Sequence, residues 1–222
     1  SQRAPDFCEL FGRQGSISGN ALLKPESGEN RDFGVSWAGT LGHREVAFDW
    51  ARFDSRARDL IVFWSNSPNT FRAYNISSAR IHGEELSLRT HPLSALALEG
   101  SLTWQSAIDD GSVTAWRGKR LPQRPGREAY ARADLTRGGF RASTDLRYLG
   151  DDYRDRYNRD RVPSRTLVGA SISAALPQGL RATVEGKNLG DRRVSDVGGY
   201  PLPGRSVFAA LELRLGLAGS AP

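Results

Sequence analysis

The segment LRATVEGKNLGDRR, residues 180–193, decides the fold class. Apolar and polar side chains alternate over residues 180–187, which is the period of a β-strand. Glu185 and Lys187 put two full charges on one face of this short strand, while Val184 and Gly186 leave the other face uncharged. The strand therefore needs water on one side and an apolar environment on the other, and it ends at the turn-forming residue Asn188.

The same period-two pattern predicts nine strands and no helix between them. The predicted strands cover residues 26–40, 43–64, 79–89, 96–104, 128–136, 140–148, 165–175, 180–187 and 206–215. Every second connection is short and contains turn formers, at 40–43, 91–94, 137–139 and 176–179. The other connections, 65–78, 105–127, 150–164 and 189–205, are long and polar. Tight turns at one end and long loops at the other are typical of an outer-membrane β-barrel.

The two faces of the later strands differ in charge. One face carries only uncharged side chains, among them Leu98, Ala131, Leu146, Ile172 and Leu211. The opposite face carries Glu99, Arg132, Asp134, Asp145, Arg147, Glu185 and Lys187. A basic side chain facing lipid near the midplane costs ~2–4 kcal/mol, so the charged face must meet water. A soluble sandwich shows the same alternation with its apolar face turned inward, and the connection lengths favour the membrane alternative.

Composition narrows the possible functions. The net charge is +6, but the basic residues are interspersed among 25 acidic ones and form no basic arm, so we expect no nucleic-acid partner. The three histidines are isolated and no catalytic or phosphate-binding motif is present, so we expect no enzyme activity, no cofactor and no metal site. The Asp- and Arg-rich loop 150–164 leaves two interpretations open, a calcium or ligand contact and a solvated loop of compensating charges.

Several motifs resemble those of TonB-dependent outer-membrane receptors. They are RAPDFCELF (3–11), GNALLKPE (19–26), NISSARIHGEE (75–85), LPQRP (121–125), VEGKNLGD (184–191) and the pair Gly204-Arg205. Their order and spacing cover nearly the whole chain. The resemblance implies that residues 1–222 are the C-terminal portion of an all-β, antiparallel transmembrane β-barrel, a fragment with about nine of roughly 22 strands. The family usually ends in an aromatic residue, whereas residues 216–222 read GLAGSAP.

The resemblance also implies a function and a set of partners. It implies a receptor of the bacterial outer membrane for TonB-dependent uptake of a scarce solute, such as a ferric siderophore or cobalamin. The expected partners are the plug domain of the same receptor, which this chain lacks, and the TonB energy-transducing complex acting through that plug. Outer-membrane lipid, lipopolysaccharide and a small-molecule or metal-chelate substrate complete the set. The alternatives are a soluble β-sandwich or barrel binding module and an outer-membrane barrel enzyme.

Site residues follow from the two ends and the two faces. The long loops supply the expected substrate contacts Arg154, Tyr157, Tyr200 and Arg205. The expected lumen- and plug-facing residues are those of the charged face, Glu99, Arg132, Asp134, Asp145, Arg147, Glu185 and Lys187. Aromatic residues near strand ends predict an interfacial girdle of Phe63, Trp64, Trp104, Tyr148 and Tyr153. Glu84 shares the parity of apolar residues, which requires either a bulge at Gly83 or a position above the lipid.

Overall fold

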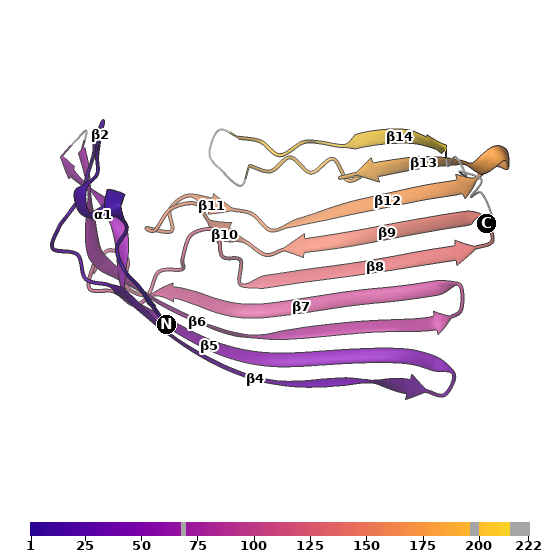
Figure 1. Cartoon of the computed structure of the whole chain (residues 1–222), viewed down its shortest axis with the longest axis horizontal. Coiled ribbons are helices and arrows are strands. Elements are labelled where there is room, and N and C mark those ends of the chain that lie inside the picture. Colours follow the sequence, from indigo (N-terminus) through magenta and orange to yellow (C-terminus); the bar gives the residue numbers. More distant parts are fainter. Residues whose placement is uncertain (68–69, 196–199, 214–222) are drawn as a thin grey trace, which may run out of the picture.

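A single curved antiparallel sheet makes up most of the protein (Figure 1). The computed structural model describes residues 1–67, 70–195 and 200–213. Nine long strands of the described part each pair with the next along the chain. They are β4 (Glu26–Leu41), β5 (Arg44–Ser67), β6 (Thr70–Leu93), β7 (Leu96–Asp109), β8 (Arg127–Arg137), β9 (Phe140–Leu149), β12 (Arg165–Ala175), β13 (Leu180–Lys187) and β14 (Ser206–Leu213). The predicted all-β antiparallel meander is confirmed.

Short elements attach to the sheet, all of them but one at its loop end. They are β1 (Gln2–Arg3), which pairs with β4, helix α1 (Phe7–Phe11), β2 (Arg13–Gln14), β3 (Ile17–Ser18), the ribbon of β10 (Asp152–Tyr153) and β11 (Arg161–Val162), and, at a tight turn, η1 (Pro177–Gly179). No helix in the described ranges is long and apolar enough to cross a membrane.

The two ends of the sheet differ as the sequence predicts. Tight turns at 42–43, 94–95, 138–139 and 176–179 lie at one end, on the right of Figure 1. Gly42 and Gly138 take φ angles of 65° and 58°, a left-handed conformation that glycine adopts at little steric cost. The second turn lies at 94–95 rather than at the predicted 91–94, because β6 continues to Leu93. Residues 214–222, which include the end of the last predicted strand, lie outside the described part.

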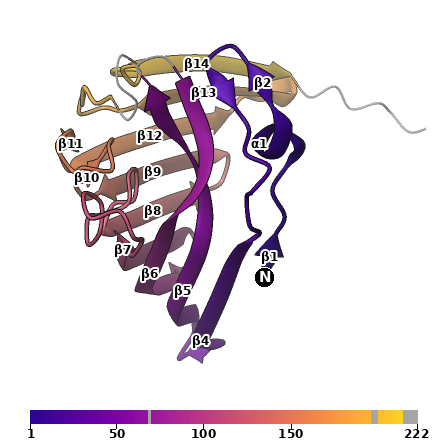
Figure 2. The same cartoon turned by 90° about the vertical axis from the view of Figure 1, so that its left-hand side faces the viewer.

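The prediction of a long polar loop over 65–78 is wrong. Strand β5 extends to Ser67 and β6 begins at Thr70, so these two strands form a hairpin that projects beyond the loop ends of the other strands, on the left of Figure 1. Register shifts on either side of Leu60 and a φ of 55° at Asp59 mark a bulge that bends the hairpin. In Figure 2 the hairpin curves toward α1 and the N-terminal segment. The sequence of residues 65–78 is too polar to predict a strand, but backbone pairing between β5 and β6 forms one in spite of this composition.

The apolar face of the sheet is uncovered by any described part of the chain. Large apolar side chains on it are exposed, for example Ile172 at 54% and Leu211 at 68%. A sandwich would bury these residues under a second sheet, which the described residues do not supply. The buried apolar residues are instead few and lie at the loop end or on β6 and β7 near it: Ala73, Ala79, Ala107, Trp116 and Val162.

The apolar face ends in a row of mixed aromatic and charged residues. Register places Phe33, Arg52, Glu84, Trp104 and Arg127 side by side across β4 to β8. The pairing through Glu84 has no register shift, and Arg52 Nη1 lies 3.4 Å from Glu84 Oε1, so Glu84 belongs to this polar row rather than to a bulge. The rows between it and the tight turns are uncharged, and charge returns only at the turns, with Arg44 and Arg137. We call this row the boundary row.

The predicted aromatic girdle is only partly in place. Trp104 lies in the boundary row and Tyr148 one row below it, opposite Ala129. Phe63 lies 11 residues beyond Arg52 along β5, roughly 36 Å at ~3.3 Å per residue, which is too far for the same interface. Tyr153 lies in the β10–β11 ribbon under Arg120. Strand length, which the sequence did not reveal, separates these residues.

A basic residue placed on the apolar face should destabilise the assembled receptor. Ala131→Arg puts a guanidinium among Gly100 and Leu146, and we expect it to lower the free energy of unfolding in a bilayer by ~2–4 kcal/mol. Ser101→Arg, one residue away in depth but on the charged face, is the control and should cost less than about 1 kcal/mol. Denaturant unfolding of the full-length receptor in vesicles measures both. Equal losses would contradict the assignment of the faces.

Candidate functional site

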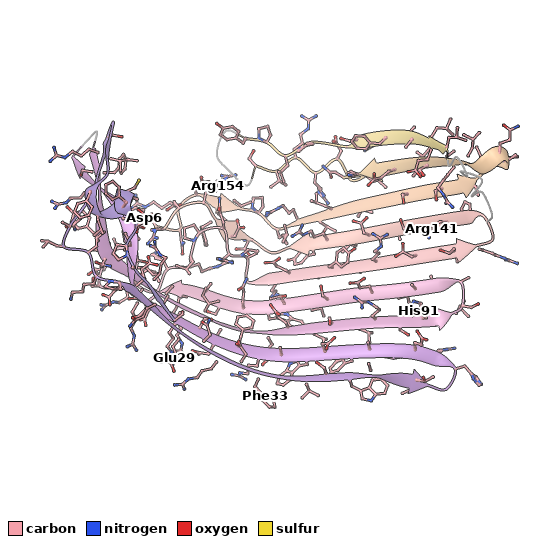
Figure 3. The ribbon with its side chains drawn as sticks, in the orientation of Figure 1. Asp6, Glu29, Phe33, His91, Arg141 and Arg154 are labelled. Carbon is pink, nitrogen blue, oxygen red and sulfur yellow. The ribbon has the colours of Figure 1, made fainter. Side chains whose placement is uncertain are left out.

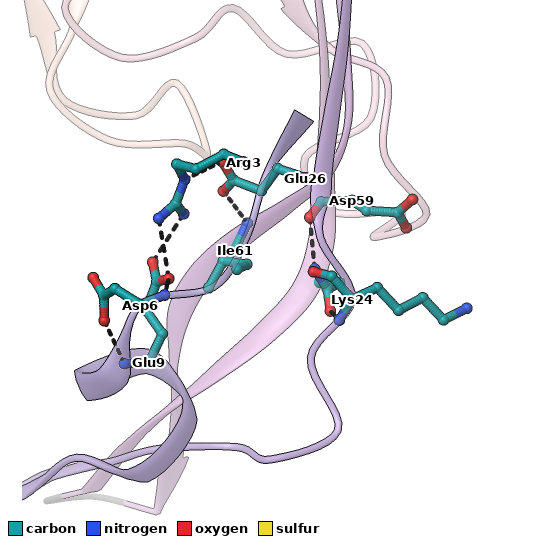
Figure 4. A network of polar contacts seen from close by, with 8 residues as sticks. Arg3, Asp6, Glu9, Lys24, Glu26, Asp59 and Ile61 are labelled. Atoms are coloured by element: carbon teal, nitrogen blue, oxygen red, sulfur yellow. Dashed lines mark hydrogen bonds and ion pairs between the residues drawn. The ribbon is translucent and has the colours of Figure 1, made fainter. Parts of the chain in front are cut away.

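A hydrogen-bonded staple fixes the N-terminal segment to the sheet (Figure 4). Arg3 donates through Nη1 and Nη2 to the carboxylate of Glu9 at 3.1 and 2.9 Å, and through Nε to Glu26 Oε2 at 2.7 Å. Glu26 Oε1 also accepts the backbone N–H of Ile61 at 2.8 Å. Asp6 and Glu9 form a capping box at the start of α1. The RAP, ELF and PE motifs are therefore parts of one structural staple.

The same segment is held at a second point by asparagines. Asn20 Nδ2 donates to the carbonyl of Ala73 at 3.0 Å. Asn75 accepts the N–H of Lys24 at 2.7 Å and donates to the carbonyl oxygens of Lys24 and Asp59. Asn75 thus joins the N-terminal segment to the bulge that bends the β5–β6 hairpin. The motif asparagines, whose role the sequence did not reveal, hold the backbone.

The loop after β7 packs on a buried tryptophan. Trp116 is fully buried, and the Arg156 guanidinium lies 4.9 Å from the centre of its ring. Arg156 Nη1 also donates to Ser77 Oγ at 3.0 Å and lies 3.5 Å from Asp109 Oδ2. Ser77 and Asp109 are both buried. The loops 110–126 and 150–164 and strand β6 are therefore joined by one cationic side chain.

Loop 150–164 is ordered by its carboxylates. Asp155 accepts the N–H groups of Tyr157, Arg159 and Asp160 at 2.7, 3.0 and 2.6 Å. These backbone hydrogen bonds, that of Asp160 first, hold the pKa of Asp155 below its usual value. No group of three metal-ligating side chains gathers within the described ranges. The loop carboxylates act on backbone N–H groups and arginines.

Asp151 anchors two arginines of the same region. Its Oδ2 lies 3.0 Å from Arg120 Nη1 and 3.3 Å from Arg161 Nε. Burial raises the pKa of Asp151, but the hydrogen bond from Arg120 and the charges of both arginines outweigh burial and hold it below its usual value. The Arg120 guanidinium also lies 5.3 Å from the centre of the Tyr153 ring.

A clasp closes the base of the last long loop. Asn188 donates to the carbonyls of Arg192 and Pro203 at 3.0 and 3.1 Å and accepts the N–H of Arg192. Asp191 Oδ1 accepts the N–H of Arg205 at 3.0 Å, a bond that lowers the pKa of this carboxyl. The segment that follows the strand 180–187 turns sharply, with φ of 49° at both Asn188 and Asp191, and its hydrogen bonds hold it against the residues just before β14.

The expected substrate residues lie at the loop end, where Figure 3 labels Arg154, but they have different surroundings. The Arg154 guanidinium donates to Asp160 at 2.6 Å and to the carbonyl of Ser195 at 3.0 and 2.7 Å. Tyr157 packs edge-on against Trp116 and is 37% exposed, whereas Tyr200 is 74% exposed. Arg205 contributes its backbone N–H to the clasp. Arg154 brings two loops together, while the tyrosines keep accessible rings.

The charged face carries a row of alternating charge. Register pairs Arg89 with Glu99, Glu99 with Arg132 and Arg132 with Asp145 across β6 to β9. Arg89 Nη2 lies 3.5 Å from Glu99 Oε1, and Arg132 holds Asp134 with two hydrogen bonds of 2.7 and 2.8 Å. Opposite charges side by side stabilise a sheet by ~0.2–1 kcal/mol per pair. The row lies on the face that the sequence assigns to water.

A hollow of about 730 Å³ opens on the charged face between β8 and β14. Five of the expected lumen-facing residues line it: Arg132, Asp145, Arg147, Glu185 and Lys187. Leu202, Pro203 and Gly204 of the last loop close one side. Lys187 Nζ lies 3.4 Å from Glu185 Oε1 and 5.4 Å from the centre of the Phe208 ring. A side chain at Gly169 would meet the Asp145 carboxylate at 2.5 Å, so this glycine leaves room for the acid.

Two acidic residues of the charged face escape the sequence prediction. Asp49 and Glu85 line a smaller hollow of about 260 Å³ between β5 and β7. Asp49 Oδ2 accepts the hydroxyl of Ser87 at 3.2 Å. Asp49 and Glu85 are assigned to the charged face by the register that pairs β5 with β6 and β6 with β7. The sequence pattern alone does not give this register.

The fold and its two faces define a class of protein, the wall and loop end of an outer-membrane β-barrel. The family model for the TonB dependent receptor-like β-barrel matches residues 1–189. The chain therefore belongs to the TonB-dependent receptor β-barrel family. A comparison with curated proteins finds no match.

Solved structures of similar fold share little sequence with this chain. The copper transporter OprC matches with a TM-score of 0.73 and 20% identity, over 95% of this chain and 36% of that one. The siderophore receptor PiuA from Acinetobacter baumannii matches with a TM-score of 0.73 and 18% identity, over 86% of this chain and 29% of that one. The ferric yersiniabactin uptake receptor FyuA from Yersinia pestis matches with a TM-score of 0.67 and 19% identity, over 85% of this chain and 29% of that one. The chain thus spans about a third of the length of these structures.

Acid should release the N-terminal staple. The hydrogen bond from Arg3, opposed by burial and aided by the N–H of Ile61, holds the pKa of Glu26 below its unfolded value. Glu26 therefore contributes stability above its unfolded pKa of about 4.3, and this contribution is lost as the pH falls through the lower folded pKa. In the full-length receptor, a probe on the exposed Cys8 should become mobile only below about pH 4.

Two variants separate the staple from general acid effects. Glu26→Gln removes a charge-assisted contact of ~1.5–3 kcal/mol. At pH 7 it should increase the population of the mobile state of the probe by about tenfold or more. Glu29→Gln, on the same strand but exposed and, among the described residues, paired only with Arg31, should leave the probe unchanged. The same probe mobility in Glu26→Gln as in the unmodified receptor would contradict the role of Glu26 in the staple.

Proposed function

We propose that this chain forms the C-terminal part of the barrel of an outer-membrane receptor that takes up a scarce solute by TonB-dependent transport. The observation that supports the proposal is a single uncovered sheet with one apolar and one charged face, with long loops at one end and tight turns at the other. The whole receptor's activity needs segments beyond this chain, including a plug domain. In this proposal residues 1–222 supply wall and loops and perform no covalent chemistry.

The charged face would meet the plug. The proposed plug-facing residues are Glu99, Arg132, Asp134, Asp145, Arg147, Glu185 and Lys187. Asp145 and Arg147 support this role most directly, because among the described residues neither side chain has a hydrogen bond or ion pair, and both line the large hollow. Glu99, Arg132 and Asp134 already have charged partners on the sheet and would form a water-lined wall.

The loop end would meet the solute. We propose Tyr157 and Tyr200 as its ring contacts, since both rings are exposed above the wall. Arg154 and Arg205 would act by holding the loops 150–164 and 188–205 in place. The proteins OprC, PiuA and FyuA, named as transporters or receptors for copper, siderophores and ferric yersiniabactin, make a metal or metal chelate the first solute class to test.

Uptake in the native host tests this proposal. Cells that carry the full-length receptor should accumulate an iron-55-loaded siderophore from a catecholate, hydroxamate and phenolate panel, or labelled cyanocobalamin, only with an active TonB complex. Tyr157→Ala and Tyr200→Ala should each weaken binding about threefold to tenfold, the contribution of one aromatic contact. Leu93→Ala, exposed at the tight-turn end, is the control. Uptake that persists without TonB would contradict the proposal.

A further inference from the structure

A third hollow, of about 460 Å³, lies where the loops meet the loop ends of β7, β8 and β9. Three arginines line it, Arg120, Arg124 and Arg127, together with Tyr148 and one acidic residue, Asp151. Neither the substrate prediction nor the plug prediction includes any of these residues.

The height of this hollow is fixed by strand register. Arg127 lies opposite Trp104 in the boundary row. One row below it lie Leu102, Ala129 and Tyr148, which begin the apolar surface. Arg127 and Tyr148 belong by parity to the apolar face and not to the charged face. Arg127 thus lies at the level where the apolar surface ends, while Arg120, bridged to Ile108 farther along β7, lines the hollow from its loop side.

The charges of this hollow are unbalanced. Asp151 is already shared by Arg120 and Arg161. Arg124 and Arg127 are exposed, and within the described ranges no carboxylate pairs with either of them. Elsewhere in the boundary row, Arg52 is neutralised by Glu84 at 3.4 Å. Two guanidinium groups are therefore open to an anion at one place on the boundary.

Two glycines pack closely beside these groups. The N–H of Gly150 donates to the carbonyl of Arg127 at 2.8 Å, which sets the two residues side by side. A side chain on Gly150 would lie 3.6 Å from Arg127 Cβ and 3.0 Å from its carbonyl oxygen. Gly126 also lines the hollow. Both glycines are thus closely packed by backbone, and the room for a compact anionic group is the open volume of the hollow itself.

We propose that this hollow binds the phosphate of an outer-leaflet lipid, whose acyl chains lie along the apolar rows below. Guanidinium groups bind phosphate through paired N–H donors, and Arg120, fixed by Asp151, keeps the polar side of the hollow in shape. A lipid fits better than a transported solute, because the hollow adjoins the uncovered apolar surface and not the charged wall. The proposal rests on the membrane location in the proposed function.

Lipid retention tests this site on the full-length receptor. The receptor in a neutral detergent is titrated with diphosphoryl lipid A, with the same lipid after removal of its phosphates, and with inorganic pyrophosphate. Retained lipid is counted by native mass spectrometry. We expect retention of the phosphorylated lipid alone, weakened about fivefold by Arg124→Gln or Arg127→Gln and about twenty-five-fold by both. Arg127→Lys keeps the charge and should retain most of the binding.

Controls separate the site from the fold and from the uptake function. Arg193→Gln removes the same charge from an exposed loop position away from the hollow and should change nothing. Thermal unfolding of each variant shows that the barrel is intact. Equal binding of the dephosphorylated lipid, pyrophosphate binding as tight as the lipid, or indifference to both arginines would overturn the site. TonB-dependent uptake is scored separately, so its failure and the failure of lipid retention are distinguishable.

Discussion

The structure depends on one constraint, an apolar sheet face that the chain itself leaves bare. Exposed Ile172 and Leu211 cost free energy in water at ~25 cal/mol per Å² of apolar surface, and the described residues provide no second layer to cover them. Lipid removes this cost, and it also demands that every charge lie on the opposite face or at one of the two ends of the apolar face. The strict alternation along β7 to β14 satisfies that demand.

With little core on the strands, polar contacts carry the architecture of the loop end. Arg3, Asn75, Asn188 and Arg156 each tie segments that are distant in sequence, and most of their partners are backbone groups or buried carboxylates. A contact of this kind fixes direction as well as distance. The loops are thus shaped in advance, in the manner that recognition by loops on a rigid scaffold requires.

The alternation of apolar and polar residues predicts most of the strands, whereas their full length and register follow only from the pairing of one strand with the next. Alternation located β12 and β13 at their observed bounds, since each has one purely apolar face. It failed over 65–78, where polar residues pair across a hairpin outside the membrane and need no apolar face. It also missed Asp49 and Glu85, whose face follows from the register of that hairpin. The motif residues Asn20 and Asn188 gave the family resemblance, but their hydrogen bonds are visible only in three dimensions.

The central claim, lipid on one face of the sheet and water on the other, can be measured at two adjacent residues. Spin labels are attached at Leu146 and Arg147 in the full-length receptor, reconstituted in a bilayer, and collisions with oxygen and with a water-soluble nickel chelate are compared. We expect frequent oxygen collisions and no nickel access at 146, and far fewer oxygen collisions at 147, which faces the lumen and the plug. The same accessibility profile at both positions would contradict it.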